Sequence, residues 1–211
     1  MPALETLLKA GAPPAIAILR GVKPGEAAAI GAALVEAGVR MIEVPLNSPD
    51  PFASIGVLQK EFGRDALIGA GTVLDTDSVD RLAETGARLL VAPNTDARVI
   101  ARGVAHGLEV LPGFFTPSEA FAAIAAGARR LKLFPAFSAG PPHLKAVREV
   151  LPEEIGIWAV GGVGAGNARD WLDVGAEGLA LGGALYRPGI EPIEIGRRAR
   201  ALVAALSSRE T

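Results

Sequence analysis

The amino-acid sequence predicts a closed (β/α)8 barrel formed by a single domain over residues 1–211. Similar phrases recur along the chain, and each combines a helix end, a glycine and a short apolar strand. Helix-length segments separate these phrases, and half of the residues are hydrophobic, so the chain can build one large core. Strands that alternate with helices pair in parallel, which favours a barrel and leaves an open doubly wound sheet as the alternative.

The repeated phrases place the strands. The clearest copies are EAGVRMIEV (36–44), ETGARLLVA (84–92), AHGLEVLPG (105–113), AAGARRLKLF (125–134) and DVGAEGLALG (173–182). Each glycine is expected to adopt the left-handed conformation that ends a helix. With three weaker copies included, the expected glycines are Gly11, Gly38, Gly63, Gly86, Gly107, Gly127, Gly156 and Gly175.

Apolar residues spaced by three and four positions predict helices between the strands, as in Phe52, Ile55, Leu58 and Phe62. Capping residues and prolines mark several expected helix starts. These starts are Pro24, Ser48 with Pro49, Asp75, and Thr116 with Pro117. The Gly/Pro-rich segment 137–142 is expected to form a loop after the sixth strand, either a lid over a substrate or an ordinary turn.

The composition excludes several classes of function. Lys and Arg total 21 against 23 Asp and Glu, so the chain offers no basic field for nucleic acid or an anionic membrane. The absence of cysteine excludes disulfides and thiolate chemistry. His106 is expected at the end of one helix and His143 at the start of another, so we expect no shared metal site. Since neither a signal peptide nor a membrane-spanning stretch is evident, we expect a cytoplasmic enzyme or binding protein.

Two charged residues lie inside strands that should otherwise be apolar. In RLKLFPA, the alternation of a strand places Leu131 and Leu133 against the helices and Lys132 in the barrel lumen. In MIEVPL, the same alternation places Glu43 in the lumen, and Arg20 ends the first strand nearby. A structural ion pair is one interpretation, but buried charges near the catalytic end of a barrel are more often functional.

A desolvated lysine beside another cation loses part of its preference for the ammonium form. Its free amine can then attack a ketone and form a Schiff base, which accepts electrons when the adjacent carbon–carbon bond breaks. Glu43 could move the protons that this cleavage requires. We therefore expect Lys132 to act as the nucleophile and Glu43 as the general acid/base, and this chemistry requires neither metal nor cofactor.

Glycine pairs follow the last two strands, in WAVGGV (158–163) and LALGGA (179–184). Adjacent glycines let backbone N–H groups approach an anion, and the loops after strands 7 and 8 of a barrel often hold phosphate. The phrase GAGTV (69–73) adds a small backbone and the hydroxyl of Thr72. The sequence thus predicts a site with a phosphate end and a reactive end.

These motifs together resemble the 2-keto-3-deoxy-6-phosphogluconate (KDPG) and 2-keto-3-deoxy-6-phosphogalactonate (KDPGal) aldolase family. The resemblance covers about residues 15–188 and rests on EVPLNSP, GAGTV, KLFPA and the two glycine pairs. It implies a class I aldolase, usually a homotrimer, that cleaves a phosphorylated keto-deoxy sugar acid to pyruvate and glyceraldehyde 3-phosphate. It also implies that Arg20 and Thr72 help to hold the substrate carboxylate or nearby oxygens, and that the phosphate lies against Gly161, Gly162, Val163, Gly182 and Gly183.

Three further positions bear on the choice of substrate. The gluconate branch of this family usually has an arginine where this chain has Asn47, and a threonine where it has Val160. The phrases APN (92–94), which contains Pro93, and AVGGV are instead similar to the galactonate branch. The resemblance therefore favours KDPGal, with KDPG or 4-hydroxy-2-oxoglutarate cleavage as the alternative. A phosphate-barrel isomerase or epimerase and a non-catalytic sugar-phosphate binder are more distant alternatives.

Overall fold

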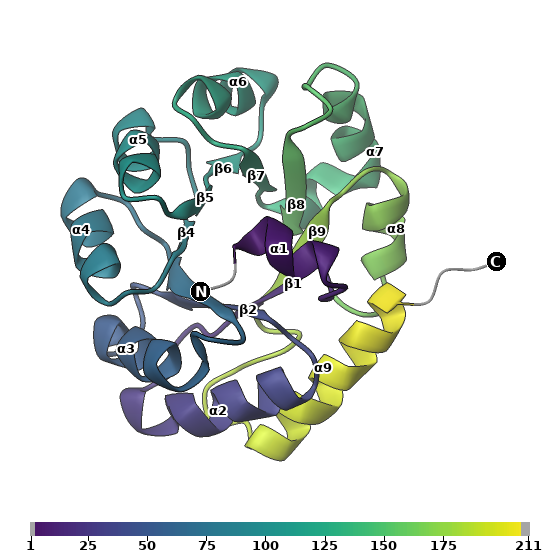
Figure 1. Cartoon of the computed structure of the whole chain (residues 1–211). Helices are drawn as coiled ribbons and strands as arrows, with labels where there is room; N and C mark the ends of the chain where they lie inside the picture. Colours follow the sequence, from purple (N-terminus) through teal and green to yellow (C-terminus); the bar gives the residue numbers. More distant parts are fainter. Residues whose placement is uncertain (1–2, 208–211) are drawn as a thin grey trace.

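The computed structural model describes residues 3–207 and shows a closed parallel barrel (Figure 1). The strands, in chain order, are β1 (Ala15–Ile18), β2 (Met41–Pro45), β3 (Leu67–Gly71), β4 (Leu89–Val91), β5 (Glu109–Leu111), β6 (Gly113–Phe114), β7 (Arg130–Leu133), β8 (Gly156–Val160) and β9 (Gly178–Leu181). They pair in the order β5-β4-β3-β2-β1-β9-β8-β7-β6. The closed arrangement confirms the predicted barrel, and the open-sheet alternative is wrong.

A proline divides one barrel strand into two segments. Only Pro112 separates β5 from β6, and proline cannot donate a backbone hydrogen bond to a neighbouring strand. Its carbonyl still accepts from the Lys132 N–H at 2.8 Å. Because β5 pairs with β4 while β6 pairs with β7, the two segments together close the ring.

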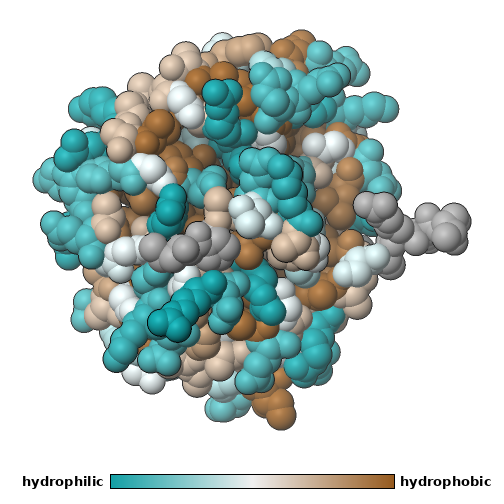
Figure 2. All heavy atoms as spheres, in the orientation of Figure 1, coloured by the Kyte–Doolittle hydropathy of each residue, from teal (hydrophilic) through white to brown (hydrophobic). Residues whose placement is uncertain are grey.

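The helices within the described residues are α1 (Leu4–Lys9), α2 (Pro24–Glu36), α3 (Pro51–Phe62), α4 (Thr76–Glu84), α5 (Ala97–Ala105), α6 (Pro117–Ala125), α7 (Ala136–Arg148), α8 (Ala168–Asp173) and α9 (Pro192–Ser207). Helices α2 to α9 surround the barrel, whereas α1 lies across its opening (Figure 1). Hydrophilic side chains cover much of the periphery of this face (Figure 2). Between residues 3 and 207, no helix is both long enough and apolar enough to cross a membrane.

Most of the predicted helix starts are confirmed. Helix α2 begins at Pro24, the Asp75 side chain accepts from the Ser78 N–H at 2.7 Å, and Thr116 forms a capping box at α6. The start predicted at Ser48 and Pro49 is wrong, because α3 begins at Pro51 after a left-handed residue. The Ser48 hydroxyl instead accepts from the Gly21 N–H at 2.9 Å and links the loops after β1 and β2.

The glycine pattern holds at six positions, which have positive φ: Gly11, Gly38, Gly86, Gly107, Gly127 and Gly175. It is wrong at Gly63, where φ is −64° and the chain continues in a right-handed turn, and at Gly156, which opens β8. Position 156 requires glycine for a different reason. A Cβ there would overlap the carboxylate of Glu177.

Two hydrophobic layers confirm the predicted orientation of the strands. Leu131, Leu133, Ile42 and Val44 belong to the large cluster between strands and helices. A second cluster fills the lumen, where it includes the fully buried Trp158 and the α1 residues Leu4 and Leu7. Since side chains alternate along a strand, Lys132 and Glu43 face this inner layer.

A polar cluster, here called the basal cluster, occupies the N-terminal end of the lumen and consists of Arg130, Glu109, Glu177 and Trp158. The Arg130 guanidinium donates to both Glu177 carboxylate oxygens, at 2.9 and 3.1 Å, and lies 3.8 Å from Glu109. The Trp158 indole donates to Glu177 at 2.6 Å. The Leu4 N–H donates to Glu109 at 3.3 Å, so α1 closes this end of the barrel.

Candidate active site

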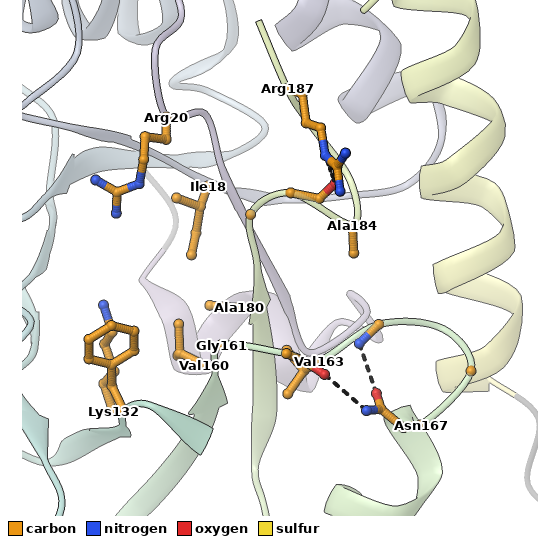
Figure 3. Close-up of a pocket in the computed structure, with 16 residues that line it drawn as sticks. Ile18, Arg20, Lys132, Val160, Gly161, Val163, Asn167, Ala180, Ala184 and Arg187 are labelled. Carbon is orange, nitrogen blue, oxygen red and sulfur yellow. Dashed lines mark hydrogen bonds between the residues drawn. The ribbon is translucent and has the colours of Figure 1, made fainter. Parts of the chain in front are cut away.

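A cavity of about 650 Å³ opens at the C-terminal ends of β1, β7, β8 and β9 (Figure 3). This is the end at which barrel enzymes place their active sites. The cavity joins the lysine on β7 to both glycine turns. Its lining includes these residues predicted from the sequence: Arg20, Lys132, Val160, Gly161, Gly162, Val163, Gly182 and Gly183.

The Lys132 side chain is 5% exposed and ends at the cavity, with its Nζ atom 4.8 Å from the centre of the Phe134 ring. Burial lowers the pKa of the Lys132 ammonium, the charge of Glu43 opposes that shift, and the charge of Arg20 adds to it. A larger fraction of Lys132 is therefore a neutral amine than would be the case in water. A neutral amine is the nucleophilic form.

Glu43 lies deeper, with 2% of its surface exposed, and it does not line the cavity itself. Burial raises the pKa of its carboxyl group to about 7, against the opposing charges of Lys132 and Arg20. Within the described residues, its Oε2 atom has no hydrogen-bond partner, and Lys132 and Glu43 form no ion pair. The carboxyl group is thus held close enough to sense the lysine charge, with one oxygen left for another molecule.

Gly71 makes the room for this carboxyl group. A Cβ at position 71, the last residue of β3, would overlap the Glu43 carboxylate. The neighbouring Thr72 has a φ of 56°, a left-handed conformation that is strained for a β-branched residue. The small backbone predicted in GAGTV is therefore required by Glu43.

Arg20 reaches the cavity mouth from the end of β1. Its Nη1 donates to the Asn47 Oδ1 at 2.6 Å, so Asn47 orients the guanidinium although it does not line the cavity. Thr72 and Pro93 follow β3 and β4 at the same end of the barrel, but they also lie outside the lining. The structure thus brings Arg20 to the lysine and leaves Asn47, Thr72 and Pro93 around it.

The first glycine turn presents backbone donors to the cavity. Gly161 and Gly162 have φ of 98° and 74°, conformations that favour glycine. A Cβ at Gly162 would come within 2.6 Å of the Phe137 Cβ, so the turn packs tightly against α7. In the described part of the chain, the N–H groups of Gly162, Val163, Gly183 and Ala184 donate to no protein acceptor.

Residues 137–142 do not form the expected loop. They belong to α7, which is interrupted at Gly140, where φ is 74° and ψ is 158°. The Phe137 N–H donates to the Gly161 carbonyl at 2.9 Å, which ties the start of α7 to the first glycine turn. The start of this segment is therefore held against the first glycine turn.

Sequence reasoning missed two polar residues of the cavity. Asn167 donates from Nδ2 to the Gly162 carbonyl at 3.0 Å and accepts from the Gly164 N–H at 2.9 Å, and so fixes the first glycine turn (Figure 3). Arg187 donates from Nε to the Gly183 carbonyl at 3.0 Å in the second turn. Their only signal in the sequence is position, since each follows a glycine pair within a few residues.

The fold and this site define a class of protein, a (β/α)8-barrel enzyme with a buried lysine amine and a buried carboxyl group at the C-terminal end of the lumen. The model of the family described as KDPG and KHG aldolase matches residues 6–195. The chain belongs to this family of carbon–carbon lyases.

Two curated relatives and one solved structure are closely similar. A probable 2-dehydro-3-deoxy-6-phosphogalactonate aldolase of Rhizobium meliloti is 50% identical, over 91% of each chain. The 2-dehydro-3-deoxy-6-phosphogalactonate aldolase of Escherichia coli is 46% identical, over 91% of this chain and 94% of the relative. A structure titled "Native KDPGal structure" superposes with a TM-score of 0.90 at 46% identity, covering 91% of this chain and 93% of the other.

Proposed function

We propose that this chain is a class I aldolase that cleaves KDPGal to pyruvate and glyceraldehyde 3-phosphate. One observation carries the proposal. The desolvated amine of Lys132 lies in the same buried site as the Glu43 carboxyl group, and within the described residues one oxygen of that group has no hydrogen-bond partner. Such a pair supplies a nucleophile and a proton carrier to one carbonyl substrate. The two relatives at 50% and 46% identity support the choice of substrate.

The proposed reaction begins when the Lys132 amine attacks the C2 ketone of KDPGal. The resulting carbinolamine takes up one proton from solvent at its hydroxyl group, loses water and leaves a protonated imine. The C3–C4 bond then breaks, its electron pair moves through C3 to the imine nitrogen, and the C4 hydroxyl proton passes to Glu43. Glyceraldehyde 3-phosphate leaves, and the remaining enamine takes a proton at C3 from Glu43 and becomes a protonated imine again. Water then hydrolyses this imine and releases pyruvate, the neutral Lys132 amine and the proton that was taken up from solvent.

The environment of Glu43 suits both proton transfers. A group with a pKa of about 7 can accept a proton and return it at neutral pH with little energetic penalty in either direction. The free Oε2 atom supports direct transfer or transfer through one water molecule. The proposal assigns both transfers to this one carboxyl group.

The proposed substrate lies along the cavity from Arg20 to the glycine turns. Arg20, oriented by Asn47, would bind the C1 carboxylate, with Thr72 and Pro93 closing that end. The C6 phosphate would accept from the N–H groups around Gly162 and Gly183. Val160 lies between the two ends and would face the middle of the substrate.

Borohydride trapping tests the mechanism. We expect pyruvate and borohydride to modify Lys132 covalently, with loss of activity in step with the modification, because reduction fixes the imine. Lys145→Met is the matched control, since Lys145 is exposed on α7 and should leave trapping intact. An unmodified Lys132, or equal labelling of exposed lysines, would contradict the mechanism.

Substrate preference is tested separately. We expect a higher kcat/KM for KDPGal than for its C4 epimer KDPG, measured by coupled pyruvate release. The reverse order would favour the gluconate alternative, and conversion of a sugar phosphate without pyruvate release would favour an isomerase or epimerase. We also propose that the protein is a homotrimer, as the family resemblance implies, and that it is cytoplasmic, as the sequence led us to expect. Sedimentation equilibrium would test the trimer.

A further inference from the structure

The cavity is strongly cationic, and its charge is divided between two ends. Its lining contains three cationic side chains, Arg20, Lys132 and Arg187, and no Asp or Glu. Arg20 and Lys132 lie at the end near Glu43, whose pKa both charges affect. Arg187 lies beside Ala184, on the side of the cavity away from Lys132 (Figure 3). The glycine-turn end therefore has a cation of its own.

Arg187 is not used in an internal ion pair. Among residues 3–207 it has no acidic partner, whereas Arg102, Arg130 and Arg197 each pair with a carboxylate. Its Nε donates to the Gly183 carbonyl at 3.0 Å, which fixes the plane of the guanidinium at the second glycine turn. The other N–H groups of the guanidinium remain for a ligand, because arginine carries five donors.

The backbone around Arg187 is firmly held although its side chain is exposed. Tyr186 is 3% exposed, and its hydroxyl donates to the Glu26 Oε1 at 3.0 Å at the start of α2. On the other side, Pro188 packs against Gly21, where a Cβ would come within 2.8 Å of its ring. An arginine anchored on both sides loses less freedom when it binds an anion.

We infer that Arg187 binds the substrate phosphate together with the glycine turns, and that it selects phosphorylated over unphosphorylated keto-deoxy acids. The inference rests on the proposed aldolase function. The turns offer only neutral N–H donors, whereas a phosphate monoester carries a charge of about −1.5 to −2 at neutral pH. A guanidinium supplies the opposite charge and binds two phosphate oxygens at once, which an isolated N–H group cannot do.

The test compares two substrates in two variants. In Arg187→Gln we expect kcat/KM for KDPGal to fall about 30-fold, mainly through KM, because a charge-assisted bidentate contact is lost. For unphosphorylated 2-keto-3-deoxygalactonate we expect a change below about threefold, since that substrate lacks the group that Arg187 binds. Arg187→Lys keeps the charge without the fork and should recover part of the loss.

Arg64→Gln is the matched control, because Arg64 is exposed in the loop between α3 and β3 at the opposite end of the barrel. It should leave both substrates unaffected. If Arg187→Gln weakens both substrates equally, or neither, the inference is overturned. Calorimetric binding of glycerol 3-phosphate, weaker in Arg187→Gln than in the wild type, tests the same contact without turnover. This binding measurement tests the Arg187 contact even if the wild type cleaves neither substrate. Absence of cleavage would refute only the proposed function.

Discussion

The lumen contains two clusters of charge that differ in how completely their hydrogen bonds are satisfied. Arg130 and Lys132 lie two residues apart on β7 and face the same lumen. Arg130 in the basal cluster donates twice to Glu177, which also accepts from Trp158. Among residues 3–207, Lys132 forms no ion pair, and one buried oxygen of the nearby Glu43 has no hydrogen-bond partner. One strand thus carries a cation that is fully paired and another that is not.

This difference distinguishes a charged cluster suited to stabilising the fold from one suited to catalysis. A buried polar group without a partner costs roughly 1 to 3 kcal/mol, so a cluster that serves stability should resemble the basal cluster. At the catalytic end, the same cost shifts the pKa values of Lys132 and Glu43 toward their neutral forms. The comparison predicts that changes at the top of the lumen affect turnover, whereas changes at the base affect stability.

The largest expected effect is that of Lys132→Met. We expect kcat for KDPGal cleavage to fall by at least about 10,000-fold, because the residue proposed to form the Schiff base is lost. The free energy of unfolding should not fall, since the amine has no described partner and methionine has a similar shape. Single-turnover kinetics and urea unfolding measure the two quantities. A large loss of stability would show that Lys132 is structural, like Arg130.

Glu43→Gln should lower kcat by about 100- to 10,000-fold, the range typical of a lost general acid/base. The amide keeps the shape of the carboxyl group but cannot exchange the proton. In the wild type, kcat/KM should rise with pH through about 7, the pKa of Glu43, as the base becomes ionised. The variant should lack this limb of the pH profile. A profile unchanged by the substitution would assign the limb to another group.

The same substitution gives a stability signature. Because the pKa of Glu43 is raised from 4.5 to about 7 on folding, the native state binds more protons than the unfolded state between these values. The free energy of unfolding should therefore fall by roughly 3 kcal/mol at most as pH rises from 4.5 to 7. Glu43→Gln should remove this dependence of stability on pH. Urea unfolding at several pH values measures it. An identical slope in both proteins would contradict the shift.

Gly71→Ala tests how closely the carboxyl group must be placed. The new methyl group would overlap the Glu43 carboxylate and move it, so kcat should fall about 100-fold, the effect of a displacement of roughly 1 Å at a reacting group. Gly25→Ala is the control, because a Cβ at that position, near the start of α2, meets nothing within 4 Å. Equal kinetics in the two variants would mean that Glu43 tolerates displacement.

Arg130→Met breaks the basal cluster. Glu177 and Glu109 would lose their cation, so unfolding free energy should fall by about 2 kcal/mol, less than for a fully buried pair because both carboxylates are partly exposed. The kcat of the folded protein should stay within about threefold of wild type, since no basal residue contacts the proposed substrate. Lost activity with intact stability would reverse the assignment of the two clusters.

Much of this arrangement could be read from the sequence, because the repeat fixes the barrel and strand alternation fixes which side chains face the lumen. Lys132 and Glu43 were placed correctly by that rule alone. Asn167 and Arg187 were missed because they follow turns, where no periodicity indicates the direction of a side chain. The partner of Arg130 could not be predicted either, because Glu177 is 47 residues away in the sequence and no local pattern connects the two residues.

The smallest expected effect concerns β8, where Trp158 belongs to the base of the lumen and Val160 to the top. Val160 is 4% exposed and lines the cavity, so Val160→Thr would add one hydroxyl beside the proposed substrate at nearly constant volume. A single neutral hydrogen bond to the C4 hydroxyl of one epimer should shift the kcat/KM ratio of KDPG to KDPGal upward by about fivefold. Val163→Thr, in the neighbouring glycine turn, is the control and should leave the epimer ratio unchanged. An unpaired hydroxyl at position 160 would also weaken binding of the other epimer. If kcat/KM changes equally for KDPG and KDPGal, the hydroxyl affects binding of both substrates and position 160 does not distinguish their C4 configuration.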